Sequence, residues 1–304
     1  MSEAPPPTDF GDYVQPFQIE AVGVRGRLVR LGPAVAAAIR PQGYPKPVAT
    51  IVAETLALGA VLASGLKYDG IFTLQLHGEG PIRLIVVDIT SDGDLRAYAR
   101  FEAGRLDPQP SPSDGSIPRL FGAGHMSFTV DQGPETERYQ GITTLEGATL
   151  SDCAHTYFRQ SEQLETAIKV CATDTAPADP APRAAALMVQ RLPPENANDA
   201  DAEDDWRRSV VLMSSATPRE LLAADLSSSQ LLYRLFHEDG VRVFRQRPLR
   251  HRCRCSRQRV SMTLRSFPAS ELLDMADDGR IVVTCEFCRA SYAFSLDQIG
   301  AESE

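Results

Sequence analysis

The sequence predicts an α+β fold with three parts: an N-terminal domain of antiparallel sheet and helices, a helical linker, and a small C-terminal zinc-binding domain. Residues 71–101 alternate between apolar and polar side chains, and an apolar stretch with helical periodicity precedes them at 45–67. Near the C-terminus, four cysteines stand in two close pairs. We place the N-terminal domain at 1–190, an acidic connector and helical linker at 191–249, and the C-terminal domain at 250–304.

The chain has 304 residues, of which 43% are hydrophobic, so it can bury a large core. Residues 1–15 contain prolines and acids but no cationic apolar segment, so we expect neither a signal nor a transit peptide and predict a cytoplasmic location. The apolar run 56–66 is about half as long as a membrane span, which favours a buried helix over a membrane helix. No membrane association is expected.

The N-terminal domain begins with an alternating strand at 21–31. The helix at 45–67 is predicted to bury the apolar residues Val48, Ile51, Val52, Leu56 and Val61. An antiparallel meander follows, with strands at 71–77, 82–89 and 95–101 that are joined by turns at Gly78-Glu79-Gly80 and Ser91-Asp92-Gly93-Asp94. A further strand is expected at 125–130 and a helix at 150–163.

The linker region starts where the composition changes. Residues 172–186 are rich in Ala and Pro, and 195–205 are acidic with few large apolar side chains, which predicts an exposed, mobile connector. Capping boxes at Thr217-Pro218-Arg219-Glu220 and Ser227-Ser228-Ser229-Gln230 begin two short helices, the second ending before Gly240. Because such short helices are not stable alone, their apolar stripes should pack on the large domain or on the zinc unit.

The C-terminal domain is predicted to hold a helix at 268–276, with Leu272, Leu273 and Met275 inward and Gly279 as its stop. A hairpin follows, with strands at 281–284 and 290–294. The second cysteine pair lies at its turn. A domain this small, with few large apolar side chains, is near the size at which a metal is needed for folding.

The two cysteine pairs, Cys253-Arg-Cys255 and Cys285-Glu-Phe-Cys288, are predicted to bind one Zn²⁺ per chain, because zinc takes four thiolates at the corners of a tetrahedron. A reducing cytoplasm favours bound metal over standing disulfides. Spacing alone favours an inert structural clip, and the Cys-x-Cys pair, which is uncommon in purely structural sites, narrows the difference from a functional site.

Besides binding a metal, such thiols could be oxidised. Cations lower thiol pKa values, and eight arginines are expected to crowd the first pair: Arg242, Arg245, Arg247, Arg250, Arg252, Arg254, Arg257 and Arg259. Peroxides attack thiolates, and each resulting sulfenic acid would have a second thiol close by. A Cys253–Cys255 disulfide would close a strained ring and be easily reduced.

The other candidate residues have ordinary structural explanations. Cys153 and Cys171 should be buried in a helix and a strand, and His251 is a possible competing ligand at a site that four thiols already fill. The remaining histidines, His77, His125, His155 and His237, are scattered and form no cluster with metal spacing.

Catalysis and nucleic-acid binding are not expected. No phosphate loop, nucleophile elbow or catalytic triad is present, so we predict that the chain is not an enzyme. The arginine-rich segment invites a nucleic-acid partner, but the net charge is −9 and interleaved aromatic residues are missing. The acidic connector is a nearer partner for these arginines.

Motifs along nearly the whole chain carry a resemblance to the redox-regulated heat shock protein 33 (33 kDa chaperonin) family. In the first half these are Val24-Arg25-Gly26, Gln75, Gly78-Glu79-Gly80-Pro81, Tyr139-Gln140-Gly141-Ile142, Tyr157-Phe158 and Ser161-Glu162-Gln163. In the second half they are Arg234-Leu235-Phe236-His237-Glu238, Cys253-Arg254-Cys255-Ser256, Cys285-Glu286-Phe287-Cys288, Tyr292 and Phe294. The segment 184–190 lacks the family's usual glycine pair, and the acidic insert is longer than usual; we place both departures at the hinge into the linker.

The resemblance implies an ATP-independent holding chaperone that binds unfolding proteins under oxidative and heat stress. The reduced, zinc-bound form would be inactive. Oxidation would form disulfides within the pairs Cys253, Cys255 and Cys285, Cys288, release zinc, unfold the C-terminal domain and loosen the linker, and homodimers would then bind clients. The alternative is a constitutive zinc-stabilised adaptor that binds nucleic acid or ribosomes through its arginines.

Overall fold

The structure is a computed structural model that describes residues 10–107, 115–133, 138–161, 165–173, 181–193 and 202–299. The chain forms two compact units, residues 1–251 and 252–304.

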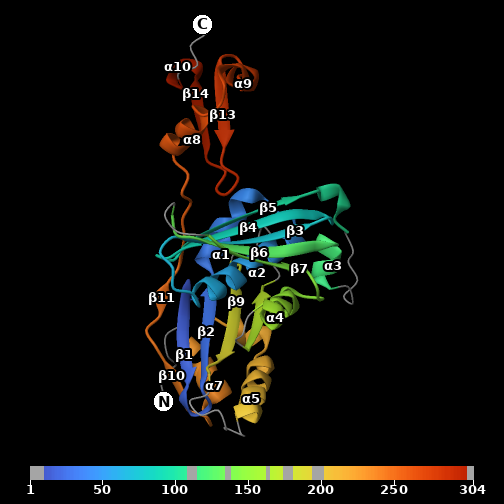
Figure 1. The fold of residues 1–304 in the computed structure, drawn as a ribbon, viewed down its shortest axis with the longest axis vertical. Coiled ribbons are helices and arrows are strands. Elements are labelled where there is room, and N and C mark those ends of the chain that lie inside the picture. Colours follow the sequence, from blue (N-terminus) through green and yellow to red (C-terminus); the bar gives the residue numbers. More distant parts are fainter. Residues whose placement is uncertain are drawn as a thin grey trace. The chain divides into compact units, whose positions relative to one another are not determined.

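The first unit contains most of the strands and helices (Figure 1). Its strands are β1 (Tyr13–Ile19), β2 (Val24–Leu31), β3 (Ile71–Gly78), β4 (Ile82–Thr90), β5 (Asp94–Phe101), β6 (Gly124–Asp131), β7 (Tyr139–Thr144), β8 (Thr166–Ala172), β9 (Ala184–Arg191), β10 (Val241–Val243), β11 (Arg247–Pro248) and β12 (Arg250–His251). Its α-helices are α1 (Pro33–Ile39), α2 (Lys46–Ala63), α3 (Ser116–Phe121), α4 (Leu150–Ser161), α5 (Ala202–Ser215), α6 (Pro218–Leu221) and α7 (Ser228–Phe236).

The strands build two sheets. The linker-side sheet has the order β10-β1-β2-β9-β8, with β11 also paired to β1, and its pairs are antiparallel. The meander sheet has the order β12-β5-β4-β3-β6-β7; only the short β12 pairs in parallel. The α+β fold class and the predicted meander are confirmed.

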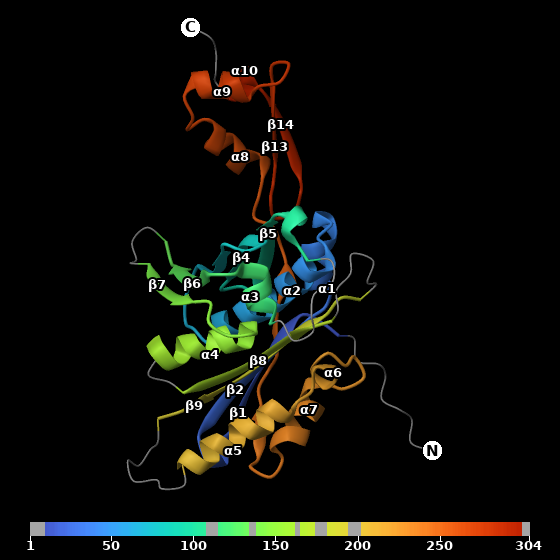
Figure 2. The ribbon, with the colours of Figure 1, turned by 90° about the vertical axis from the view of Figure 1, so that its right-hand side faces the viewer.

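Helix α2 lies between the two sheets and supplies the centre of the main core (Figure 2). The helix is long and apolar enough to cross a membrane by length and composition, but it is largely buried inside this unit, as a core helix is. The five side chains predicted to face inward are buried, which confirms that prediction: Val48, Ile51, Val52, Leu56 and Val61. The apolar surface that α2 buries on both sides stabilises the first unit.

Glu54 is the one carboxylate of α2, and its burial raises its pKa to about 7 from an ordinary 4.5. Because the folded chain favours the protonated acid, its contribution to stability is complete below about pH 4.5 and is lost as the pH rises through 7. We expect Glu54→Gln to stabilise the first unit by about 2–3 kcal/mol at pH 8 and by much less at pH 5. Calorimetry of both proteins checks this, and an equal gain at the two pH values would contradict it.

The second face of the linker-side sheet is covered by α5, α6 and α7 (Figure 2). Phe236 of α7 stacks on Phe17 of β1, with ring centroids 5.7 Å apart. The buried residues of α6 and α7 in this layer are Leu221, Leu231, Leu232, Leu235 and Phe236. The short helices therefore dock on the large unit, which was one of the two predicted partners.

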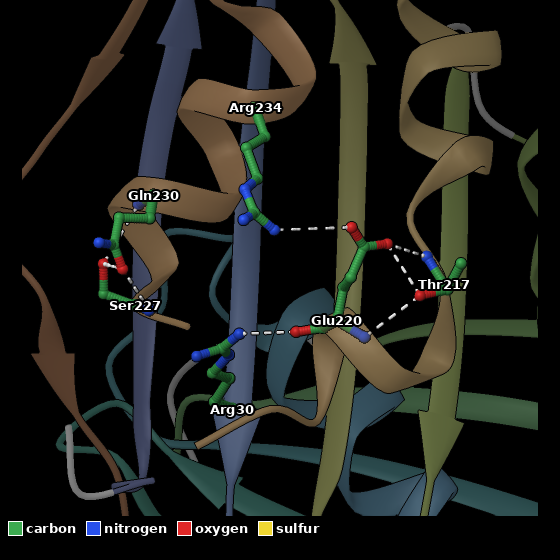
Figure 3. A network of polar contacts seen from close by, with 6 residues as sticks. All are labelled: Arg30, Thr217, Glu220, Ser227, Gln230 and Arg234. Atoms are coloured by element: carbon green, nitrogen blue, oxygen red, sulfur yellow. Dashed lines mark hydrogen bonds and ion pairs between the residues drawn. The ribbon is translucent and has the colours of Figure 1, made fainter. Parts of the chain in front are cut away.

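Both predicted capping boxes are present (Figure 3). The Thr217 hydroxyl accepts from the Glu220 main-chain N–H at 3.2 Å, and the Glu220 carboxylate accepts from the Thr217 N–H at 2.9 Å. Ser227 and Gln230 make the same exchange at the start of α7. These bonds satisfy main-chain donors that a helix cannot pair internally, so local sequence alone fixes where the two helices begin.

Several elements differ from the sequence predictions. The strand expected at 21–31 begins at Val24, because Glu20–Val22 form a 3₁₀ turn that ends at Gly23, whose φ of 59° is left-handed. The helix expected at 45–67 ends at Ala63, and the helix expected at 150–163 is helical to Ser161, its last two residues lying outside the described ranges. Strands β1, β7 and β9 and helices α1, α3 and α5 were not predicted as such, and for β8 only a strand at Cys171 was expected.

The acidic connector is only partly described. Residues 195–201 lie outside the described ranges, whereas 202–205 form the first turn of α5, so the prediction of a mobile connector is wrong for these four residues. Their carboxylates lie at a helix N-terminus, where negative charge is stabilising. Segment 184–190 is also not a hinge: it lies in β9, which is buried and paired on both sides.

The second unit consists of α8 (Arg257–Leu264), α9 (Ala269–Met275), β13 (Arg280–Thr284), β14 (Ser291–Ser295) and α10 (Leu296–Ile299). The predicted hairpin is β13–β14, and the predicted helix is α9. Only Leu272 of α9 is buried; Leu273 and Met275 are 49% and 45% exposed, so the prediction that they point inward is wrong. The core has five buried side chains: Leu264, Leu272, Ile281, Phe294 and Ile299.

Candidate metal centre

Four thiols meet at one end of the second unit's hairpin. Cys253 and Cys255 lie in the segment that precedes α8, and Cys285 and Cys288 lie in the turn between β13 and β14. Their ligand atoms all lie within 4.8 Å of one another. The Sγ atoms of Cys253 and Cys285 are 3.7 Å apart, and those of Cys255 and Cys288 are 3.4 Å apart.

These separations fit a tetrahedral zinc–thiolate site. With a Zn–S bond of about 2.3 Å, the sulfurs of such a site lie about 3.8 Å apart. All four residues are half-buried, which is typical of a site that is formed by side chains at the surface of a small domain. The donor set is soft and matches the preference of zinc among the divalent metals.

The local chain conformation aims main-chain donors at the sulfurs. The turn is closed by the Cys285 N–H, which donates to the Ala290 carbonyl at 2.9 Å, and by left-handed Arg289, with φ of 60°. The N–H groups of Phe287 and Cys288 donate to the Cys285 sulfur, and that of Ala290 donates to the Cys288 sulfur. Such bonds stabilise thiolates and orient metal ligands.

The thiol pKa values show how charge is distributed in the cluster. Burial opposes ionisation of Cys253, but the Cys255 N–H and the other three thiols donate to its sulfur, and its pKa falls to about 7. Burial raises the pKa of Cys288 to about 12, and burial also raises the pKa of Cys285. The first negative charge is favoured and further charges are opposed, and a dication offsets such opposed charges.

Tyr292 of β14 completes the cluster. Its hydroxyl lies 3.2 Å from the Cys255 Sγ. That contact raises the pKa of Tyr292 to about 12. A phenol that donates to a thiolate is a supporting contact of the kind that tunes metal affinity. The sequence did not predict the contact between Tyr292 and Cys255, because no spacing rule connects a strand residue with a cysteine 37 positions away.

The predicted crowd of arginines around the first pair is not supported. Arg242 pairs with Glu20 at 3.0 Å and Arg250 pairs with Asp94, all within the first unit. The pKa shifts of the cysteines arise from burial, from one another and from neighbouring main-chain N–H groups.

Two arginines of the second unit have other partners. Arg257 lies over the Phe294 ring at 4.3 Å, and Arg259 donates to the Arg254 carbonyl at 2.8 Å. Four of the eight arginines that were predicted to crowd the first pair therefore contact other groups.

The other cysteines are buried, as predicted. Cys153 lies in α4 and Cys171 in β8, and burial raises the pKa of each thiol to about 12. Thiols that stay protonated react slowly with oxidants, so neither is a candidate switch residue.

The histidines lie outside the thiol cluster. His251 is in β12 of the first unit, and His155 accepts the Ile168 N–H at 2.7 Å, a structural role. His237 follows α7 and is exposed. His77 and His125 are not scattered as predicted, because they face each other across β3 and β6 with rings stacked 4.6 Å apart. In the described ranges, the thiol cluster is the only group of three or more residues with metal-binding proximity.

The fold and the thiol cluster together define a class: an α+β protein with a four-cysteine C-terminal module. A family model described as Hsp33 protein matches residues 12–295. The chain is 39% identical to the 33 kDa chaperonin of Caulobacter vibrioides, over 99% of this chain and 100% of that protein. It is 37% identical to the 33 kDa chaperonin of Azotobacter vinelandii, over 96% and 94% of the two chains, and 35% identical to that of Ectopseudomonas mendocina, over 97% and 98%.

The crystal structure of the 33 kDa chaperonin (heat shock protein 33 homolog) from Thermotoga maritima has the same fold. Its TM-score is 0.79 at 21% identity, and the match covers 95% of this chain and 96% of that chain. The chain belongs to the Hsp33 family.

Proposed function

We propose that this chain is an ATP-independent holding chaperone whose zinc-bound C-terminal unit keeps it inactive until an oxidant releases the metal. Family membership supports the chaperone part, because the relatives are named 33 kDa chaperonins. The observation that supports regulation by metal and oxidant is the cluster of four thiols on a five-residue core. In this proposal 1–190 is the chaperone core, 191–249 the linker and 250–304 the switch.

The proposed zinc ligands are Cys253, Cys255, Cys285 and Cys288. Bound zinc would supply the folding free energy that the small core lacks, since structural zinc sites contribute on the order of 10 kcal/mol. The residues of the chain hold the ligands in place: the hairpin turn aims N–H groups at Cys285 and Cys288, and Tyr292 contacts Cys255. Loss of the four ligands would leave a unit that is too small to remain folded.

In the proposed oxidation, each hydrogen peroxide takes two electrons and two protons from two thiols, which leaves one disulfide and two waters. Peroxide first converts one thiol into a sulfenic acid and a water; the second thiol then attacks the sulfenic sulfur, the S–S bond forms, and the hydroxyl leaves as the second water. Pairing within Cys253–Cys255 and Cys285–Cys288 is proposed from the family resemblance. A disulfide sulfur is a poor zinc ligand, so oxidation and metal release would proceed together.

The surface that activation would expose is the linker-covered face of the first unit. The apolar residues of α7 pack on β1 and β2, so their stripes are covered by the linker-side sheet within the first unit. Of the two partners expected from the sequence, the large domain is the one on which these helices pack, so in this proposal unfolding of the zinc unit frees the linker to leave the sheet. Exposed apolar area of this kind binds unfolding proteins. We also propose that the active form is a homodimer and that the protein is cytoplasmic.

The test compares reduced, zinc-loaded protein with protein treated with peroxide at elevated temperature. We expect oxidation to release about one zinc per chain and to convert the protein into one that suppresses aggregation of a thermally unfolded client. Zinc release is followed with a chromogenic chelator, aggregation by light scattering, and disulfide pairing by mass spectrometry of peptides. Equal protection by the reduced form, or zinc that stays bound after oxidation, would overturn the proposal.

The adaptor alternative has less support. Two of the arginines that would bind nucleic acid, Arg242 and Arg250, are already paired with Glu20 and Asp94. It requires the reduced protein to bind nucleic acid tightly and with a steep dependence on salt, which a filter-binding titration measures.

A further inference from the structure

Arg30 is a fully buried arginine whose partners belong to the linker. It lies on β2, 2% exposed, on the face of the linker-side sheet that α5, α6 and α7 cover. Its Nη1 donates to the Leu226 carbonyl at 2.5 Å, and its Nη2 donates to the Glu220 carbonyl at 3.1 Å. Figure 3 shows the guanidinium reaching from the strand to the chain that carries Glu220. One side chain therefore binds both ends of the segment 220–226.

Arg183 makes a second contact of the same kind. It precedes β9, and its Nη1 donates to the Leu222 carbonyl at 3.0 Å. The guanidinium groups of Arg183 and Arg30 each lie over the Phe10 ring, at 5.1 and 5.2 Å from its centroid. Two arginines, one on β2 and one directly before β9, thus bind three main-chain carbonyls of the segment 220–226, and both stack on the Phe10 ring.

No carboxylate of the described residues neutralises these two cations. The carboxylate of Glu220, whose carbonyl Arg30 binds, instead bonds Thr217 and lies 4.0 Å from Arg234 (Figure 3). Burial lowers the pKa of Arg30, a hydrogen bond with the Tyr13 side chain opposes that shift, and the nearby Arg183 adds to it. The Arg30 Nε is buried without a hydrogen-bond partner among the described residues. Together with Tyr13, the linker carbonyls therefore supply Arg30 with interactions that water would otherwise provide.

We propose that Arg30 and Arg183 form a linker anchor: the two guanidiniums position the α6–α7 connection on the sheet and set how readily the linker leaves it. The apolar contacts of α7 are non-directional and do not fix the register of the segment, whereas three hydrogen bonds from Arg30 of β2 and from Arg183, which directly precedes β9, do. Without the arginines, the carbonyls of Leu222 and Leu226 would lose these donors, and the Glu220 carbonyl would keep only its main-chain donors, such as the Ala223 N–H at 3.4 Å. The link to activation rests on the proposed function; the positioning role does not.

Trp206 provides the readout. It is the only tryptophan of the chain, lies in α5, and is buried in the same apolar cluster as α6 and α7. Release of the linker should therefore make its indole accessible to acrylamide and shift its emission to the red.

The experiment uses full-length, reduced, zinc-loaded protein. We expect Arg30→Met to increase the fraction of acrylamide-accessible Trp206 about tenfold, while zinc content stays at the level of the unaltered protein. Arg30→Lys keeps the charge but cannot span two carbonyls, so its effect should be intermediate. Arg183→Met removes the single hydrogen bond to the Leu222 carbonyl from a less buried side chain, and it should also increase Trp206 accessibility. This variant tests the anchor if Arg30→Met does not fold.

The matched control is Arg27→Met. Arg27 lies on the same strand but on its opposite face, and its Nε donates to the Ser64 carbonyl at the end of α2. This variant should lower overall stability but leave Trp206 accessibility in the folded protein unchanged. Two results would overturn the anchor. In the first, Trp206 is as well protected from acrylamide in Arg30→Met and Arg183→Met as in the unaltered protein. In the second, Trp206 becomes as accessible in the Arg27→Met control as in Arg30→Met. Either result leaves the peroxide test of the proposed function unaffected.

Discussion

Replacing Cys285 with serine is expected to abolish tight zinc binding and to unfold the second unit of the reduced protein. Serine supplies no thiolate, so one corner of the tetrahedron is lost together with the sulfur that accepts the N–H groups of Phe287 and Cys288. The five-residue core cannot replace a contribution on the order of 10 kcal/mol. Zinc content should fall from about one per chain to nearly none, and amide hydrogens of β13 and β14 should exchange rapidly.

Cys153→Ser is the matched control, because Cys153 is a buried cysteine of α4 in the first unit. It should lower the stability of the first unit by about 1–3 kcal/mol through its buried hydroxyl, but zinc content and hairpin exchange should not change. A Cys285→Ser protein that keeps one zinc, or whose hairpin stays protected, would show that the ligand set is wrong.

The candidate site was predictable from the sequence as far as local spacing reaches. Cysteines two and three positions apart necessarily lie close together, and a hairpin turn at Cys285 places its pair at one point in space. The positions of the arginines were not predictable in this way. Arg242 and Arg250 are near the first pair in sequence, but β10 and β12 commit them to the first unit, where Glu20 and Asp94 pair with them.

The fold was predictable where one face of an element is buried and the other is not. Strand β3 alternates cleanly because Phe72, Leu74 and Leu76 face α2, and the meander was found for that reason. Strand β9 pairs with β2 and β8 at its two edges and is buried on both faces. Its sequence therefore does not alternate between apolar and polar residues, and it was noticed only as a change in composition. Helix α5 begins with acidic residues, which in a sequence are typical of a solvated connector. The buried Trp206 is the residue that indicates packing of this segment on the first unit.

The arrangement of the linker bears on how the proposed activation would proceed. Its apolar residues are covered by a sheet of the first unit, so unfolding of the second unit would not by itself uncover them. In the proposed function, release requires that the docked state be only modestly favoured. A buried Arg30 and a half-buried Arg183, neither paired with a carboxylate of the described residues, are one physical reason why docking would be so balanced.

Replacing Phe236 with alanine is expected to release the linker without any oxidant. Phe236 is 1% exposed and stacks on Phe17, so its truncation should cost the docked state about 3–5 kcal/mol. Because the second unit does not contain this residue, zinc should remain bound while Trp206 becomes accessible and the reduced protein suppresses client aggregation. Light scattering with a thermally unfolded client, on protein of verified zinc content, measures the result.

Tyr233→Ala is the control for Phe236→Ala, since Tyr233 lies in the same helix but is 63% exposed. It should change neither Trp206 accessibility nor client protection, because truncating an exposed side chain alters stability by only about 0.5 kcal/mol. If Phe236→Ala exposes Trp206 but still fails to protect the client, the face beneath the linker is not the client-binding surface, and a separate consequence of oxidation must create one. If Phe236→Ala protects only after zinc has been lost, linker release follows unfolding of the second unit and is not sufficient for activity.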